Sequence, residues 1–307
     1  MALLSQQPDR LFLITGATGK TGTTAVHLLL ERGHRVRALV HREDDRSAAL
    51  AAAGAEIVVG DLLDLHAVSS AMRGVSGAYF VYPIAPALVD ATVVFAQAAT
   101  EAGVRSIVNL SQISARREAA SNAARQHWLC ERLLDRTSML TTHLRPTFFA
   151  EWISQFWSLE DGQGVLRLPF GTGRHAPVAG VDQSYVIAAI LENPEPHDRQ
   201  IYPLHGPVEM DNYGIAAATS RALGIPVRYE PISVEEFADR LASLGMSSHL
   251  IQHLSNVAID YQNGIFRGTN NLIEVIGNRT PLTVEEFVHD RRHLFDRNGQ
   301  FVSASLT

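Results

Sequence analysis

The stretch Leu11-Phe12-Leu13-Ile14-Thr15-Gly16-Ala17-Thr18-Gly19-Lys20-Thr21-Gly22 decides the fold of this chain. Its G-x-x-G-x-x-G pattern follows a short apolar run and opens an amphipathic one. The first glycine allows a tight turn from strand to helix, the second lets the backbone approach a pyrophosphate, and the third lets the helix pack on the strand. Amides and the positive end of the helix dipole then face the phosphates. We therefore predict a dinucleotide-binding turn, with a glycine-rich turn that binds nothing as the alternative. The expected contacts are Gly16, Thr18, Gly19, Lys20, Thr21 and Gly22.

Short apolar runs alternate with longer amphipathic runs through the first half of the chain. This alternation predicts an α/β fold with a doubly wound parallel Rossmann sheet. The expected strands are Leu11–Thr15, Val36–Val40, Glu56–Val59, Ala78–Tyr82, Ser106–Leu110 and Thr142–Arg145. The expected helices are Thr21–Arg32, Ser47–Ala53, Leu65–Met72, Val89–Ala102, Asn122–Thr137 and Phe149–Leu159.

The second half reads differently, because short elements with frequent Gly and Pro follow Gly162. Two capping boxes, opened by Ser233 and Thr283, mark helix starts there. We predict a smaller α+β C-terminal lobe over the carboxyl ends of the strands. The expected division is a Rossmann domain at residues 1–160, with later strands returning from the second half, and a substrate-binding or interaction lobe at residues 161–307.

Composition limits the classes of function. The 307 residues are 46% hydrophobic and 19% charged, which is ordinary for a soluble globular protein. A net charge of −6 argues against direct nucleic-acid binding. No apolar stretch reaches the length of a membrane span, and the N-terminus lacks the layout of a secretion signal. We therefore expect a cytoplasmic protein. We also expect no metal site, because Cys130 is the single cysteine and the histidines show no ligand set.

Positive charge follows the second expected strand. His41 and Arg42 stand where a protein that prefers NAD usually carries Asp or Glu for the ribose hydroxyl. Arg37 and Lys20 add to this charge, while the acidic residues 43–45 weigh against it. We expect NADP(H), with the 2′-phosphate near Arg42. NAD(H) is the alternative if Arg42 is only a solvated loop charge.

Two residue pairs follow later strands. Asp61-Leu62 comes after the third strand and is expected to face the adenine, unless Asp61 only caps the next helix. Tyr82-Pro83 ends the fourth strand and borders the same region, because ligands lie beyond the carboxyl ends of parallel strands. Tyr82 is a candidate proton donor, or it only packs beside the cofactor.

With these features in place, the chain resembles the short-chain dehydrogenase/reductase superfamily and, more narrowly, its atypical NmrA-like branch. That branch includes redox-sensing regulators, and the pattern is nearest to its quinone oxidoreductase-like and triphenylmethane reductase-like members. The resemblance covers most of the chain. It is carried by the glycine-rich turn, Val36–Val40, His127–Glu131, Leu144–Phe149, Gly277–Thr283 and Glu286-Phe287.

The best-known branch of this superfamily uses a Tyr and a Lys four residues apart, with a Ser on the fifth strand. The resemblance places Ser111 at the Ser, Ala123 at the Tyr and His127 at the Lys. Alanine cannot donate a proton, so a Tyr-dependent alcohol dehydrogenase is not expected. The resemblance implies that His127 faces the nicotinamide ribose. Glu131, four residues on, is expected to pair with His127 and raise the pKa of its imidazole, unless the contact is only structural.

An aromatic run follows the sixth strand. Phe149, Trp152 and Phe156 have the spacing of one helical face, and Phe148 precedes them. We predict that these four residues line a substrate pocket, with plain core packing as the alternative.

The favoured function is an NADPH-dependent reductase of a conjugated electrophile, such as a quinone or azo compound, by direct hydride transfer. The candidate catalytic residues are Tyr82, Ser111 and His127, all of which also border the cofactor. A non-catalytic NADP(H) sensor is the alternative. The expected partner is a small-molecule substrate, with a homodimer or a regulatory protein partner as further candidates.

Overall fold

The computed structural model describes residues 10–296. Its centre is a seven-stranded parallel sheet in the order β10-β6-β5-β4-β1-β2-β3. The strands are β1 (Leu11–Thr15), β2 (Arg35–Val40), β3 (Glu56–Val59), β4 (Gly77–Phe80), β5 (Ser106–Leu110), β6 (Leu140–Pro146) and β10 (Gln200–Leu204). The strand order reverses between β1 and β4, which is where ligands bind in doubly wound sheets. The predicted Rossmann fold is confirmed.

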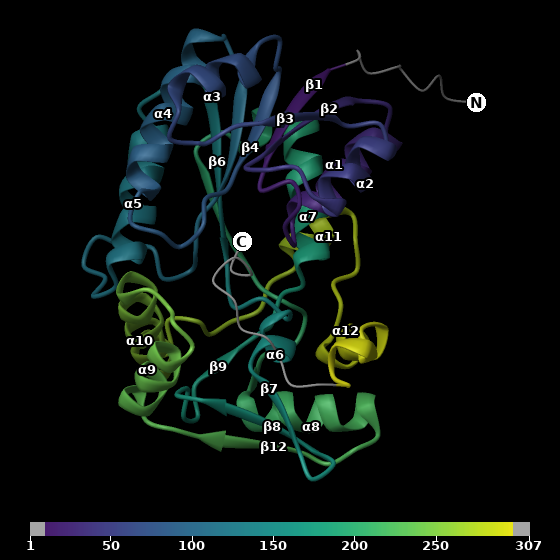
Figure 1. Cartoon of the computed structure of the whole chain (residues 1–307), viewed down its shortest axis with the longest axis vertical. Helices are drawn as coiled ribbons and strands as arrows, with labels where there is room; N and C mark the ends of the chain where they lie inside the picture. The colour runs from purple at the N-terminus through teal and green to yellow at the C-terminus, as the bar shows by residue number, and fades with distance from the viewer. Residues whose placement is uncertain (1–9, 297–307) are drawn as a thin grey trace.

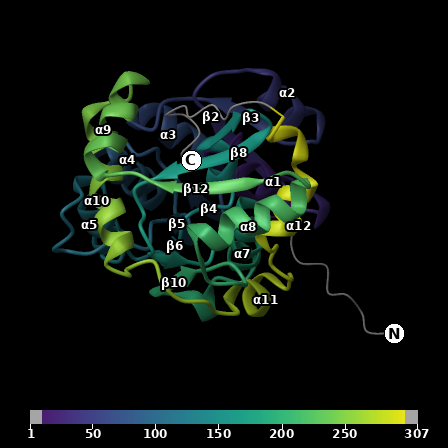
Figure 2. The same cartoon turned by 90° about the horizontal axis from the view of Figure 1, so that it is seen from below.

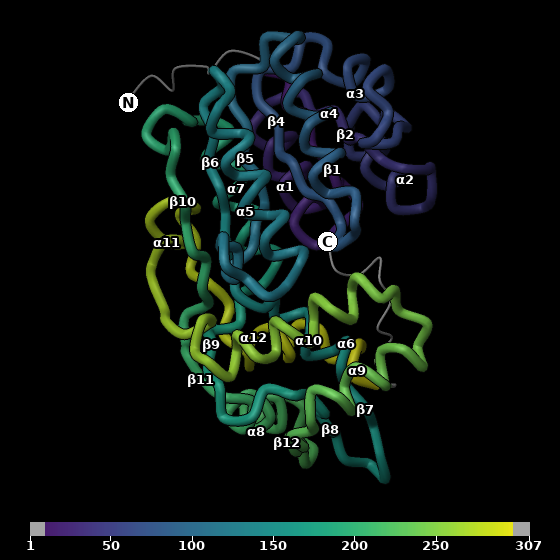
Figure 3. Tube along the Cα trace, turned by 90° about the vertical axis from the view of Figure 1, so that its left-hand side faces the viewer, coloured from purple at the N-terminus to yellow at the C-terminus, as the bar shows by residue number. Residues whose placement is uncertain are grey.

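Helices cover both faces of this sheet (Figures 1 and 3). One face carries α3 (Leu65–Met72), α4 (Leu88–Glu101) and α5 (Asn122–Leu134), and the other carries α1 (Gly22–Glu31), α7 (Gly180–Glu192) and α11 (Leu272–Gly277), while α2 (Asp45–Ala52) follows β2. Side chains that alternate along β1 serve the two faces, because Leu11 and Leu13 pack in one core cluster while Phe12 and Ile14 pack in the other.

A smaller lobe lies below the sheet and covers its carboxyl end (Figures 1 and 2). It contains the three-stranded sheet β12-β8-β7 and the short pair β11-β9. Its strands are β7 (Trp157–Glu160), β8 (Gln163–Leu168), β9 (Arg174–His175), β11 (Met210–Asp211) and β12 (Val227–Pro231). Its helices are α6 (Trp152–Gln155), α8 (Asn212–Leu223), α9 (Val234–Ser243), α10 (Ser248–Gln262) and α12 (Val284–Asp290), and two single 3₁₀ turns occur at Glu195–His197 and Arg292–Leu294.

The division at residue 160 stays a prediction. Three elements from beyond that point, α7, β10 and α11, belong to the layers of the large sheet. None of the helices within residues 10–296 is long and apolar enough to cross a membrane.

One predicted helix, Phe149–Leu159, is wrong. Only α6 is helical, and β7 begins at Trp157. Asp161 and Gly162 have φ angles of 47° and 77°, so they form a tight two-residue turn that pairs β7 with β8. An Asp-Gly pair is a strong hairpin signal, and it overrides the helical spacing of the aromatic residues. Trp157 consequently packs in the core of the lobe, where its indole nitrogen donates to the carbonyl of Phe295 at 3.1 Å.

The carboxyl ends of β1 and β4 are joined by one hydroxyl group. The Thr15 hydroxyl donates to the carbonyl of Val81 at 3.1 Å and accepts from its amide at 2.9 Å. Thr15 is completely buried, so water cannot replace either bond. This double contact fixes Val81 directly beside the glycine-rich turn.

We therefore expect Thr15→Val, which keeps the side-chain shape, to lower the free energy of unfolding by about 1–3 kcal/mol, because the buried Val81 amide loses its partner. Urea denaturation measures this change. Thr100→Val is the control, since the Thr100 hydroxyl bonds only to a carbonyl of its own helix, that of Ala96. Equal midpoints for the two variants would show that the contact contributes little.

Candidate functional site

A cleft of about 550 Å³ lies at the carboxyl ends of β1, β2, β3 and β4. We call it the glycine-turn cleft. Its volume lies within the range of small-molecule sites in proteins. Most of the predicted cofactor contacts line it, namely Gly16, Thr18, Gly19, His41, Arg42, Asp61, Leu62, Tyr82 and Pro83.

The glycines of the turn are required by close approach. Gly16 has a φ of 56°, and a Cβ atom there would lie 2.4 Å from Val81 Cγ1. A Cβ atom on Gly22 would lie 2.2 Å from the Gly16 carbonyl oxygen, so this glycine lets α1 pack against the turn. Helix α1 has no side-chain cap and no acidic residue in its first turn. Its amino end therefore suits an anion rather than a cation.

Six predicted contacts do not line the cleft, and two of them, Ser111 and His127, line a neighbouring cavity instead. Gly22 packs against the turn, and Thr21 faces the core, where its hydroxyl lies 2.8 Å from that of Tyr79. Lys20 is half-buried, and burial lowers the pKa of its amine to about 8 although Glu151 acts in the opposite direction. Arg37 donates to the carbonyl of Ala71 at 2.6 Å. Its place on β2 turns it toward the end of α3, because side chains alternate along a strand.

Arg42 remains available at the cleft. It is exposed, and within residues 10–296 its guanidinium has no hydrogen bond or ion pair. One of the three acidic residues nearby is compensated, because Asp44 caps α2 and binds the guanidinium of Arg46 at 2.6 Å. The Arg46 hydrogen bond and the helix amides hold the pKa of Asp44 below its usual value. The acidic run therefore weighs less against a phosphate at Arg42 than its sequence suggests.

Asp61 is not the cap of the following helix. Asp64 caps α3 by accepting from the amides of His66 and Ala67. Asp61 accepts from the Leu63 amide at 2.9 Å and stays in the wall of the cleft. The structure thus removes the alternative reading of Asp61.

A second, narrower cavity of about 90 Å³ adjoins the cleft. We call it the aromatic cavity. It shares Val81 and Tyr82 with the glycine-turn cleft. Its other lining residues are Ile84, Leu110, Ser111, Gln112, His127, Pro146, Thr147, Phe148, Phe149, Trp152, His253, Leu254, Val257 and Phe266. The predicted pocket residues Phe148, Phe149 and Trp152 lie in its wall. Phe156 does not, because α6 ends before it and its ring packs against Phe237.

His127 is buried in the wall of the aromatic cavity, and within the described chain its Nε2 atom has no hydrogen-bond partner. Burial lowers the pKa of its imidazole to about 4, although the charge of Glu131 acts in the opposite direction. The charge of Glu131 thus acts in the predicted direction, but the expected net rise of the pKa does not occur, because desolvation of the buried imidazole is the larger effect.

Glu131 is completely buried and accepts side-chain hydrogen bonds from two residues other than His127. Arg145 binds both of its oxygens, with Nε–Oε1 at 2.8 Å and Nη2–Oε2 at 2.5 Å. Ser111 donates its hydroxyl to Oε1 at 2.6 Å. The Ser111 proton thus points at a carboxylate, and its oxygen is left as an acceptor toward the cavity. Ser111 is not poised to donate a proton to a substrate.

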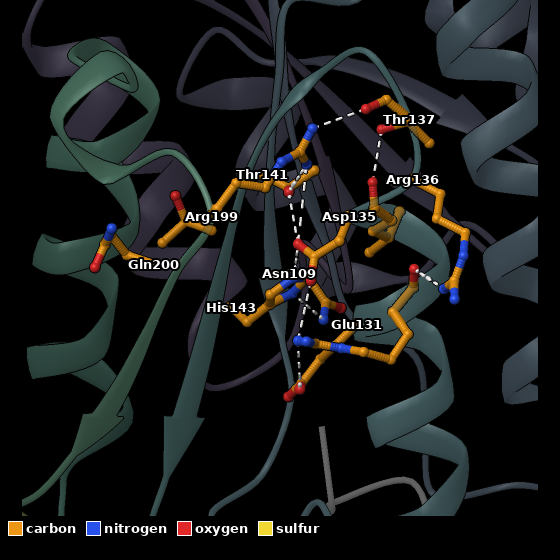
Figure 4. A network of polar contacts seen from close by, with 12 residues as sticks. Asn109, Glu131, Asp135, Arg136, Thr137, Thr141, His143, Arg199 and Gln200 are labelled. Carbon is orange, nitrogen blue, oxygen red and sulfur yellow. Dashed lines mark hydrogen bonds and ion pairs between the residues drawn. The ribbon is translucent and has the colours of Figure 1, made fainter.

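A connected polar network holds the carboxyl end of α5 against the sheet (Figure 4). His143 lies 3.0 Å from the carboxylate of Asp135 and 3.1 Å from the amide nitrogen of Asn109. An amide nitrogen can only donate, so His143 accepts at Nδ1 and gives its Nε2 proton to Asp135. Glu131 lies one helical turn before Asp135 (Figure 4). The network therefore fixes α5, the helix that also carries His127.

Three polar residues that line the aromatic cavity were not predicted from the sequence. Gln112 follows β5 and Thr147 follows β6, so the rule that ligands lie beyond the carboxyl ends of strands could have found both. His253 comes from α10, and its Nδ1 lies 2.8 Å from the hydroxyl of Ser121. No local signal connects α10 with this cavity, because the contact depends on how the lobe packs on α5.

The chain belongs to the NmrA-like family, whose model matches residues 8–287. It is 28% identical to the NAD(P)H azoreductase of Xenophilus azovorans over 279 residues, which covers 90% of this chain and 96% of the relative. The NADPH complex of the NADPH-dependent quinone oxidoreductase of Escherichia coli superposes with a TM-score of 0.80 at 25% identity, over 93% of this chain and all of that one. The NAD complex of the negative transcriptional regulator NmrA also has a TM-score of 0.80, at 16% identity over 93% of this chain and 96% of that one, which is a likeness of fold.

The low pKa of His127 predicts a pH dependence of stability. The unfolded chain takes up a proton near pH 6.5, whereas the folded protein resists it down to about pH 4. The stability that the neutral, buried imidazole gives the folded protein is therefore fully present above pH 6.5 and is lost as the pH falls from 6.5 to about 4. We expect unfolding free energy to fall more steeply in the parent than in His127→Gln, by at most about 1.4 kcal/mol per pH unit.

Urea denaturation between pH 4 and pH 7 measures this difference. His66→Gln, which changes an exposed histidine of α3, is the matched control. Parallel curves for the parent and His127→Gln would contradict the buried, neutral state of His127.

Proposed function

We propose that this chain is an NADPH-dependent reductase that transfers hydride directly to a conjugated, electrophilic small molecule such as a quinone or an azo compound. One observation carries the proposal. The glycine-turn cleft and the aromatic cavity meet at Val81 and Tyr82. A cofactor held in the first would therefore end beside a substrate held in the second. A protein that only senses the cofactor needs no such adjoining cavity.

The residues of the glycine-turn cleft fit a phosphorylated dinucleotide. The turn brings backbone close to the ligand, because Gly16 and Gly22 leave no room for side chains. The amino end of α1 favours the pyrophosphate, and the unpaired guanidinium of Arg42 favours a 2′-phosphate. Asp61 and Leu62 lie where the adenosine half would be held. When bound, the cofactor supplies a hydride.

The remaining residues orient and shield the reactants. Phe148, Phe149 and Trp152 give flat apolar walls that exclude water. Among the described lining residues, none is a strong proton donor, because Ser111 donates to Glu131 and His127 is neutral at pH 7. Burial, with some help from Asp61, raises the pKa of Tyr82. An acceptor that takes the incoming charge into its own conjugated system needs no such donor.

The similarity to an NAD(P)H azoreductase and to a quinone oxidoreductase supports reduction of this substrate class. A homodimer, a regulatory protein partner and a cytoplasmic location stay predictions.

The reductase proposal predicts oxidation of NADPH, followed by its absorbance, in the presence of a quinone, an azo dye or a triarylmethane dye. At least one acceptor should give turnover that depends on the protein. Absence of turnover with every acceptor, together with equal affinity for oxidised and reduced cofactor, would favour the NADP(H) sensor instead.

For the cofactor preference, we expect Arg42→Ala to weaken NADP(H) binding about tenfold or more through the lost phosphate contact, and to leave NAD(H) binding nearly unchanged. Titration calorimetry with both dinucleotides measures the ratio. Arg240→Ala on α9 is the control, because Arg240 is an exposed arginine of the lobe paired with Glu236. An unchanged ratio in Arg42→Ala would refute the role of its charge.

A further inference from the structure

The aromatic cavity has a polar side. Three buried side-chain atoms that line it, Gln112 Nε2, His127 Nε2 and Thr147 Oγ1, have no hydrogen-bond partner within residues 10–296. A buried polar atom without a partner costs about 1–3 kcal/mol, so native proteins retain few of them. Three around one small cavity indicate a place where a ligand completes the hydrogen bonds.

The orientation of Gln112 is fixed by its neighbours. Its Oε1 accepts from the hydroxyl of Ser114 at 2.7 Å, so the amide nitrogen is the end left toward the cavity. The carbonyl of Ser114 accepts from Arg116 at 3.2 Å, and both oxygens of Asp260 on α10 bind Arg116. Gln112 therefore presents N–H donors from a loop that is tied to the lobe.

The hydroxyl of Thr147 is the second group in this cavity that can bind a ligand. It lies directly after β6, and its backbone amide donates to the carbonyl of Leu204 on β10 at 3.0 Å. Its side chain is 3% exposed, so its hydroxyl has no access to bulk water. A threonine hydroxyl can donate or accept, and it can therefore complement an oxygen atom of a ligand.

The aromatic cavity offers no negative charge that could pair with a cationic ligand. None of its described lining residues is a carboxylic acid, and Glu131 behind it is bound by Arg145. His127 and His253 are neutral at pH 7, because burial lowers their pKa values to about 4 and about 3. An organic cation would lose its hydration here without gaining a counter-ion. A neutral molecule with oxygen acceptors matches the donors.

We infer that Gln112 and Thr147, together with His127, form a specificity-determining subsite for a carbonyl oxygen of a neutral conjugated substrate, and that cationic dyes bind poorly. This inference rests on the proposed reductase function. The hydride brings two electrons to the substrate, the negative charge gathers on the carbonyl oxygen, and that oxygen then takes a proton from water. Donors aimed at this oxygen stabilise the charge as it develops.

The test compares Gln112→Met and Thr147→Val with the conservative variant Thr147→Ser, which keeps the hydroxyl. Binding of menadione without cofactor is followed by quenching of tryptophan fluorescence, since Trp152 lines the cavity. We expect about tenfold weaker binding in Gln112→Met and Thr147→Val, as for a lost hydrogen bond, and near-parental binding in Thr147→Ser. Methylnaphthalene, which has no oxygen, should bind all four proteins alike.

Rates are measured in parallel with NADPH against menadione and the cationic dye malachite green. We expect kcat/KM for menadione to fall about tenfold in the same two variants and malachite green to be the poorer substrate of the parent. Gln97→Met on the exposed face of α4 is the control, and circular dichroism shows whether each variant folds.

Unchanged menadione binding in both folded variants, or malachite green bound as tightly as menadione, would overturn the subsite. The proposed reductase function fails separately if the parent binds menadione but no acceptor is reduced. In that case the binding measurements still decide the subsite.

Discussion

The hydroxyl of Thr15 extends the pairing of the two strands on which the site is built to their carboxyl ends. By donating to and accepting from Val81, it fixes the carboxyl ends of β1 and β4 at the point where the strand order reverses. Gly16 leaves β1 one residue later and packs against the side chain of Val81. Val81 and Tyr82 in turn border both the glycine-turn cleft and the aromatic cavity. This buried pair of hydrogen bonds therefore fixes Val81 where the glycine-turn cleft and the aromatic cavity meet.

The electrostatics of the site follow from the burial of Glu131. A carboxylate in the interior needs partners, and Arg145 and Ser111 supply them. Because Ser111 is one of these partners, it cannot offer its proton to the cavity, while burial keeps His127 neutral. The site thus provides orientation and hydrogen-bond donors, while the acid-base machinery of the Tyr-Lys type is absent from its described residues. Chemistry at such a site depends on an acceptor that is already electrophilic.

Local patterns predicted most of the large sheet and most of the glycine-turn cleft. The apolar runs of β1 to β6 and the spacing of Gly16 and Gly22 are short-range signals, so they can be recognised from neighbouring residues alone. The aromatic run after β6 failed because two signals competed there. The Asp161-Gly162 turn pairs β7 with β8, so the chain forms a hairpin there although the aromatic residues have helical spacing. The predicted contact of Arg37 with the cofactor is absent from the cleft, because the pleat of β2 turns its side chain toward the end of α3.

The sequence by itself determined the α/β alternation, the glycine-rich turn and the family to which the chain belongs, since each is written in neighbouring residues. Only the tertiary structure decided the chemistry of the aromatic cavity. The pKa of His127 depends on how completely other segments bury it, the direction of the Ser111 proton depends on Glu131 from a different element, and His253 arrives from α10 of the lobe. Desolvation and hydrogen-bond direction are set by contacts between distant segments, and such contacts exist only after the chain has folded.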